Sequence, residues 1–121
     1  MKFNVEWAGK TYSYDPEDIT VRQGMVIKTY TGLDLKPWEH ALNDGDVKSW
    51  QALMWLMKQM NGERTQIQTE DFPIVRFMNT FNQASQDAAD AQAAEEAAEK
   101  AEQDGRPKDS DGGPELTGGL A

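Results

Sequence analysis

Few residues of this chain have the types and spacing that catalysis requires. Its single histidine, His40, stands beside Glu39. A histidine that acts as a general base needs a group to orient it and a nucleophile to deprotonate, and no motif in the sequence supplies either. We therefore interpret His40 as a surface or structural residue. The sequence predicts no catalytic residue and a protein that is not an enzyme.

The sequence also offers little for metal or cofactor binding. Asp44 and Asp46 flank a glycine, but a calcium-binding EF-hand loop that began at Asp44 would need glutamate at its twelfth position, where Trp55 stands. Helix capping explains the two aspartates. The glycine pairs at 112–113 and 118–119 lack the strand, helix and lysine of a phosphate-binding loop. Because the chain has no cysteine, thiolate ligands are excluded, and we expect neither a metal nor a cofactor.

Residues 46–61, DVKSWQALMWLMKQMN, form the most strongly apolar stretch of the chain. At about 100° per residue, their apolar side chains form one wide helical stripe, which comprises Val47, Trp50, Leu53, Met54, Met57 and Met60. Trp55 falls off this stripe, beside Lys58. Two interpretations of Trp55 remain open. It belongs to the core, packed against a hairpin or the last helix, or it is an aromatic anchor at a protein interface, where tryptophan is enriched among energetic hot spots.

The candidate partner-binding residues follow from the second interpretation. The same two interpretations, core residue or interface anchor, are open for Trp38, although its signal is weaker than that of Trp55. Methionines at helical spacing more often belong to a core than to a recognition surface, but two of them neighbour Trp55. The predicted partner-binding set is therefore Trp55, Trp38, Met54, Met57 and Lys58.

The elements that must position these residues begin with a predicted β-hairpin. Phe3, Val5 and Trp7 alternate with polar residues, which is typical of a half-buried strand. A turn at residues 8–9 leads to a second strand at residues 10–14. Because a lone hairpin is marginal in water, its apolar face must lie on a helix or pair with another chain. Its exposed edges would permit strand pairing between copies.

Four helical segments are predicted after the hairpin. The first begins at Asp15 and Pro16 and ends at Gly32, and the second covers residues 35–42. Residues 46–61 form the central helix. The last segment begins at residues 71–73, ends near Asn82 and carries an apolar stripe formed by Ile74, Phe77, Met78 and Phe81. Gly24 interrupts the first helix, and close packing against a neighbouring element explains it.

The predicted fold is therefore α+β and mostly α, with the hairpin packed on a small bundle of about four helical segments. This folded domain covers residues 1–82. Residues 83–103 are rich in Ala and Glu and predict a solvated helix, because nothing there larger than alanine can be buried. Residues 104–121 are acidic and rich in glycine, which predicts a disordered tail.

The charge of the chain is uneven and limits its partners. Residues 1–82 hold 11 acidic and nine basic side chains, whereas residues 83–121 hold ten acidic and three basic ones, and the whole chain has a net charge of −9. An acidic chain repels nucleic-acid backbones and anionic membranes. The N-terminus is too polar for a signal peptide, and no apolar run approaches the length of a membrane span. We expect a soluble, intracellular protein that binds neither nucleic acid nor membrane.

Several short patterns follow one another in residues 3–82. They are F-x-V-x-W-x-G-K-x-Y-x-Y-D, Y-T-G-L-D-L, N-D-G-D, W-Q-A-L-M-W-L-M-K-Q-M-N-G and D-F-P, with a Trp-containing segment between the second and third. An Ala/Glu-rich tail that ends in glycines comes after them. This order resembles the tail assembly chaperones of long-tailed bacteriophages.

The resemblance implies a non-enzymatic function. Chaperones of this family bind the long, aggregation-prone tape measure protein and keep it soluble until tail tube subunits polymerise around it. Many are made as a short form and a frameshifted long form, and this chain would be the short form. The expected partners are the tape measure protein, the frameshifted long form and further copies of the chain. The expected location is the host cytoplasm and not the mature virion.

Two other functions remain open at this stage. The first is an acidic inhibitor that mimics DNA and occupies the nucleic-acid site of an enzyme. Against it, most of the negative charge lies in the predicted tail and not on a folded face. The second is a structural component of the tail, which would be present in the assembled particle.

Overall fold

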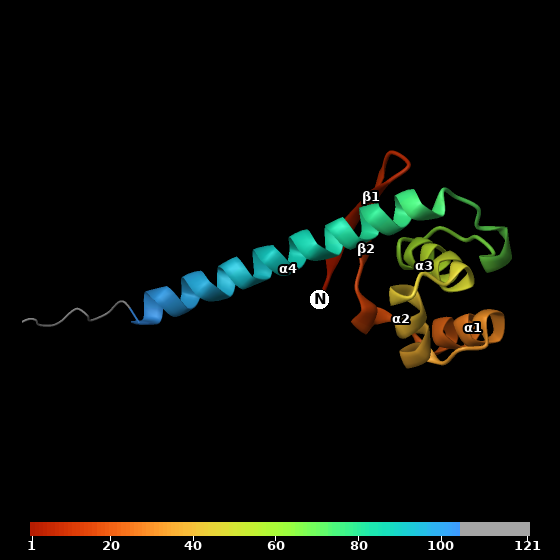
Figure 1. The fold of residues 1–121 in the computed structure, drawn as a ribbon, viewed down its shortest axis with the longest axis horizontal. Helices are drawn as coiled ribbons and strands as arrows, with labels where there is room; N and C mark the ends of the chain where they lie inside the picture. The colour runs from red at the N-terminus through yellow and green to blue at the C-terminus, as the bar shows by residue number, and fades with distance from the viewer. Residues whose placement is uncertain (105–121) are drawn as a thin grey trace, which may run out of the picture. The chain divides into compact units, whose positions relative to one another are not determined.

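The structure, a computed structural model, describes residues 1–104 and is an α+β fold dominated by helices (Figure 1). A two-stranded antiparallel hairpin precedes four α-helices, and two short 3-10 helices lie between these elements. In chain order they are β1 (Phe3–Trp7), β2 (Lys10–Tyr14), η1 (Pro16–Asp18), α1 (Val21–Thr31), α2 (Leu35–Asn43), α3 (Val47–Met60), η2 (Ile67–Thr69) and α4 (Ile74–Asp104). The predicted α+β class is therefore confirmed. The predicted disordered tail, from residue 105 on, lies outside the described residues.

The N-terminal hairpin has the predicted strands and turn. Val5 pairs with Tyr12 at its centre, and both side chains are buried against the helices. The turn residues Ala8 and Gly9 have φ angles of 53° and 77°, the positive values that a tight two-residue hairpin turn requires. On the outer edge of β2, the Asn61 side chain accepts from the Ser13 N–H and donates to the Ser13 carbonyl, both at 2.9 Å. This edge is therefore closed to strand pairing at Ser13.

The first helix begins later than the sequence predicted. Residues 16–18 form a separate 3-10 turn, and α1 begins only at Val21. The reason is a capping box: the Thr20 hydroxyl accepts from the Gln23 N–H at 3.1 Å, and the Gln23 side chain accepts from the Thr20 N–H at 3.0 Å. The predicted end is confirmed, because Gly32 has a φ of 79° and donates its N–H to the Lys28 carbonyl at 2.7 Å.

Gly24 lies where α1 meets α2. A methyl group added at Gly24 would stand 3.7 Å from the nearest atom of the Leu35 side chain, which is ordinary van der Waals contact. The expected close packing therefore does not explain the glycine, because an alanine side chain fits beside Leu35.

Helix α3 is the centre of the folded unit and is buried on more sides than the sequence predicted. Ser49, Trp50 and all six residues from 52 to 57 are buried, so the single predicted stripe was too narrow. The physical reason is that α1, α2, β2 and η2 all contact α3. Val47, which the stripe included, is instead 66% exposed.

Helix α4 is one continuous helix of 31 residues, whereas the sequence predicted two segments divided near Asn82. No glycine or proline interrupts residues 74–104, and the Ala, Gln and Glu residues after Asn82 sustain a helix. The predicted apolar stripe is confirmed: Phe77 is fully buried, and Ile74, Met78 and Phe81 pack against the core. The chain divides into two compact units, Met1–Ser85 and a second that begins at Gln86.

Candidate functional site

Four of the five predicted partner-binding residues lie in the core. Trp38, Met54 and Met57 are at most 1% exposed and Trp55 is 8% exposed. The Trp55 indole donates its N–H to the Thr65 carbonyl at 3.0 Å. The exposure that the interface interpretation of Trp55 required is therefore absent, and its core interpretation holds. Its hydrogen-bond partner belongs to the connection after α3.

The fifth residue, Lys58, also has a structural role. Its ammonium group pairs with the Glu70 carboxylate at 2.8 Å, and the Glu70 side chain is only 3% exposed. The second Glu70 oxygen accepts a hydrogen bond from the Thr65 hydroxyl. Because a buried carboxylate is costly without partners, Lys58 stabilises the connection between α3 and α4.

A second polar cluster fixes the hairpin to the same connection. Glu63 accepts from the Tyr12 hydroxyl at 2.8 Å and from the Lys10 ammonium at 3.1 Å. The hydrogen bond from Tyr12, and after it the hydrogen bond from Lys10, hold the pKa of the Glu63 carboxyl below its ordinary value. Burial, together with the bond to Glu63, raises the pKa of Tyr12 to about 12. Both shifts favour the neutral phenol bound to a charged carboxylate, so this cluster is a structural contact.

The four tryptophans differ in what their indole N–H groups contact. Trp38 donates to the Ser49 carbonyl at 3.1 Å and Trp50 to the Leu42 carbonyl at 2.9 Å, and Trp55 is also paired. Trp7 is half-buried, and its indole N–H has no partner within residues 1–104. Tryptophan is enriched at interfaces because it combines a large apolar ring with a polar donor. Trp7 is therefore the tryptophan with a donor available to a ligand.

Trp7 lines an open cleft of about 530 Å³ between the hairpin turn and the start of α4, which we term the hairpin-tip cleft. Its principal lining residues are Glu6, Trp7, Asp71, Phe72, Pro73 and Arg76. A cleft of this size accepts a few side chains of a peptide. All of its lining residues belong to the first compact unit.

Aromatic rings form the apolar wall of the cleft. The Trp7 and Phe72 rings meet edge to face with centroids 6.5 Å apart, and each contacts Phe77, at 5.1 Å and 5.3 Å. Phe77 is a fully buried residue of α4, and the Trp7 and Phe72 rings pack against it. Edge-to-face packing of this kind restrains both rings, so the wall is already formed without a ligand.

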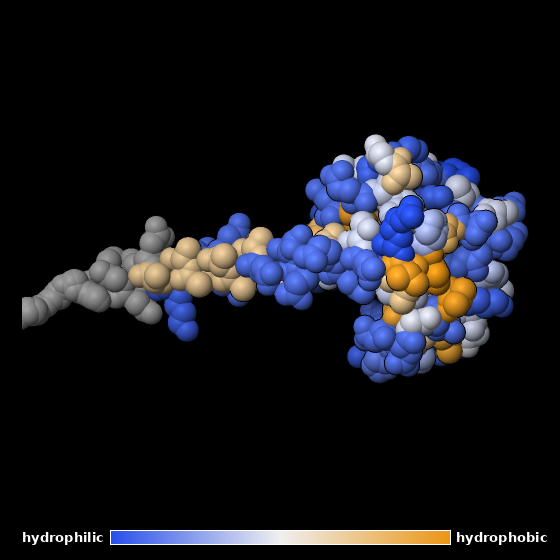
Figure 2. Space-filling model, turned by 45° about the horizontal axis from the view of Figure 1, so that its top comes forward, coloured by the Kyte–Doolittle hydropathy of each residue, from blue (hydrophilic) through white to orange (hydrophobic). Residues whose placement is uncertain are grey.

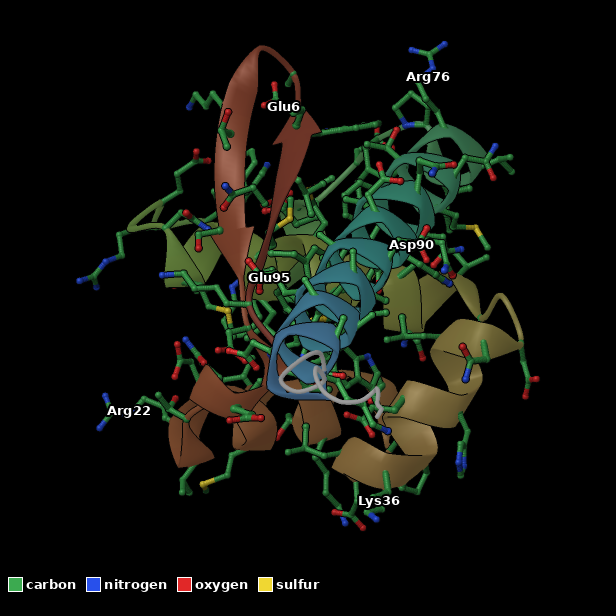
Figure 3. All side chains as sticks on the ribbon, turned by 90° about the vertical axis from the view of Figure 1, so that its left-hand side faces the viewer. Glu6, Arg22, Lys36, Arg76, Asp90 and Glu95 are labelled. Atoms are coloured by element: carbon green, nitrogen blue, oxygen red, sulfur yellow. The ribbon has the colours of Figure 1, made fainter. Side chains whose placement is uncertain are left out.

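Charged groups surround this aromatic wall. Glu6 accepts a hydrogen bond from the Thr11 hydroxyl at 3.0 Å, whereas neither Asp71 nor Arg76 has an ion pair within the described part of the chain. Figure 3 shows Glu6 beside the hairpin turn and Arg76 extending outward from the start of α4. The cleft thus combines an apolar wall, a tryptophan donor and the charges of Asp71 and Arg76, which are unpaired within residues 1–104, and such a combination is typical of protein-binding surfaces.

Other kinds of site find less support. No group of three His, Asp or Glu side chains converges within residues 1–104 in a way that could hold a metal ion. In the same range, no helix has both the length and the apolar character to cross a membrane.

Comparisons with protein-family models, with curated proteins and with solved structures find no match to this chain. The sequence did not predict the hairpin-tip cleft, because Trp7 and Phe72 have the positions of ordinary core residues of the hairpin and of a helix start. The usable signal was the position of Trp7 at the end of its strand, next to the turn, where the core no longer covers it.

Proposed function

We propose that this protein is a non-enzymatic binding protein that holds another protein chain in the hairpin-tip cleft. The observation that carries the proposal is the half-buried Trp7, whose indole N–H has no partner within residues 1–104, whereas the other three indoles are paired. Buried tryptophans at the centre of an interface are frequent hot spots, and their loss costs about 2 kcal/mol or more. A bound chain would cover the Trp7 and Phe72 rings and supply a carbonyl oxygen to the indole.

We further propose that the bound chain is the tape measure protein of a bacteriophage tail and that this protein is its assembly chaperone. The support is the resemblance of residues 3–82 to that family, together with a preformed aromatic cleft that suits a client. The frameshifted long form would present the same cleft, because it shares this N-terminal part. The protein would act in the host cytoplasm and leave before the virion is complete.

Co-expression with the largest coiled-coil-like protein encoded just downstream tests both statements. We expect a soluble complex in a pull-down, and we expect the client to be insoluble when it is expressed alone. A client that is soluble by itself and does not co-purify would refute the chaperone function. Screening for an inhibited DNA-binding enzyme would then follow.

Two pairs of variants test the cleft itself. Arg76→Glu reverses a free charge in the cleft, and Arg64→Glu reverses an exposed arginine that does not line it. Trp7→Phe removes the free indole N–H, and Phe72→Ala removes the opposite wall. We expect client recovery to fall with Arg76→Glu, Trp7→Phe and Phe72→Ala and to stay unchanged with Arg64→Glu, while circular dichroism shows each variant folded. Equal recovery from Arg76→Glu and Arg64→Glu, together with full recovery from Trp7→Phe, would place the client elsewhere.

A further inference from the structure

Helix α1 exposes apolar side chains that no other element within residues 1–104 covers. Val21 is 82% exposed and Met25 is 64% exposed, and they stand one helical turn apart on the same side of α1. With Arg22, Val26 and Thr29 they line a shallow open depression of about 630 Å³. We term this surface the α1 face. Exposed methionine suits a surface that adapts to a partner helix.

Helix α1 is itself basic, although the chain as a whole is acidic. Val21–Thr31 holds Arg22 and Lys28 and no acidic side chain, a net charge of +2 in a chain of net charge −9, and Glu17 and Asp18 precede the helix. Lys28 is already paired with Asp34 at 2.9 Å. Arg22 and Lys36 have no ion pair within residues 1–104, and Figure 3 shows both side chains extending outward from the unit.

The part of α4 that belongs to the second compact unit is acidic. Between Gln86 and Ala101, α4 carries five carboxylates and one lysine, a net charge of −4. Every side chain from residue 89 to 101 is exposed. Figure 2 shows pale orange alanines along this part of the helix, among hydrophilic residues. Glu95, Glu99 and Ala98 share one shallow surface, so acidic and small apolar side chains lie on one side of the helix.

We propose that the α1 face of one copy binds the acidic, alanine-bearing side of α4 from a second copy. Ala94 and Ala98 have the same one-turn spacing as Val21 and Met25 and let the two helices approach closely. Charge complementarity selects the occupant, because Arg22, which lines the α1 face, would meet the carboxylates of Glu95 and its neighbours. The contact joins two different surfaces, so it is heterologous and links copies head to tail.

Sedimentation velocity on the full chain at increasing concentration tests this contact. We expect the mass-average mass to rise above the 13.6 kDa of one chain at low salt and to fall back as salt is added, because exposed charge pairs are screened. Arg22→Glu and Glu95→Arg should each weaken association. The double variant Arg22→Glu/Glu95→Arg, and an equimolar mixture of the two single variants, should restore it.

A matched pair of variants tests the apolar part. Met25→Glu should abolish association, whereas Val75→Glu, at a residue with 65% exposure elsewhere on the first unit, should leave it unchanged. A chain that stays at monomer mass at every concentration would overturn the proposal. So would association that is equally sensitive to Met25→Glu and Val75→Glu, or a double charge reversal that restores nothing. Client recovery is measured separately, so failure here leaves the proposed function intact.

Discussion

The burial of Trp55 makes a quantitative prediction about stability. Replacing a buried tryptophan by alanine costs about 3–5 kcal/mol, and Trp55 is 8% exposed. A domain of this size loses about 4–8 °C in Tm for each kcal/mol. We therefore expect Trp55→Ala to lower the Tm of the folded unit by at least about 12 °C, measured by circular dichroism.

A comparison of two conservative substitutions separates the contribution of the Trp55 hydrogen bond to stability from the contribution of the Trp55 ring. Trp55→Phe removes the donor to the Thr65 carbonyl, but the Gln59 side chain still donates to that carbonyl at 3.2 Å. The cost of the lost bond is therefore at the lower end of the usual range, about 1 kcal/mol. Trp7→Phe makes a similar change in ring size and removes a donor that has no partner within residues 1–104.

We therefore expect Trp55→Phe to lower the free energy of unfolding by about 1 kcal/mol more than Trp7→Phe does, measured by urea denaturation. Equal losses for the two variants would show that the Trp55 hydrogen bond contributes nothing. A Trp55→Ala variant that keeps its Tm within about 3 °C of the unmodified protein would contradict the core position itself.

Three further predictions concern single contacts. Gly24→Ala should raise the free energy of unfolding by about 1 kcal/mol, because the added methyl fits and glycine is costly in a helix interior; a lower urea midpoint would contradict this. Glu63→Gln should cost about 1 kcal/mol at pH 7. Because the pKa of Glu63 is lowered by Tyr12 and Lys10, this difference should be complete above pH 4.5, the ordinary value, and disappear as the pH falls below it; a difference that persists at low pH in urea titrations would refute it. Glu70→Gln should cost about 2 kcal/mol by weakening the partly buried pair with Lys58, and an unchanged thermal midpoint would show that the pair is neutral.

Local sequence signals predicted the elements of this fold well. The period-2 alternation around Val5 predicted strand β1, and Gly32 predicted the end of α1. Both predictions were correct because each signal depends on the backbone conformation of residues that are neighbours in sequence. The start of α1 was missed although its signal is also local. Thr20 followed three residues later by Gln23 is a capping box. It sets the start of α1 at Val21, so the turn that begins at Pro16 remains a separate 3-10 helix.

Burial was harder to predict because it depends on what surrounds a helix. A single apolar stripe describes a helix with one covered side, but α3 is enclosed by four other elements, so Trp55 is buried beside the stripe while Val47, at its end, is exposed. The hairpin-tip cleft was missed for the same reason. Its residues come from β1, the hairpin turn, the connection before α4 and the first part of α4. No pattern within any of these segments shows that Trp7 and Phe72 meet.

The positions of the four tryptophans connect stability with binding. An indole whose N–H is paired and whose ring is covered contributes its free energy to folding, and a partner would have to open the core to reach it. That applies to Trp50 and Trp55, which belong to α3, and to Trp38 of α2, whose indole donates to the Ser49 carbonyl of α3. Trp7 is held by Phe77 on one side and open to the cleft on the other, so its ring is restrained while its donor stays available. Binding energy gained there does not have to offset the ordering of a mobile side chain. For this reason we propose that recognition takes place at the end of the hairpin, while the apolar helix at the centre of the chain provides the scaffold.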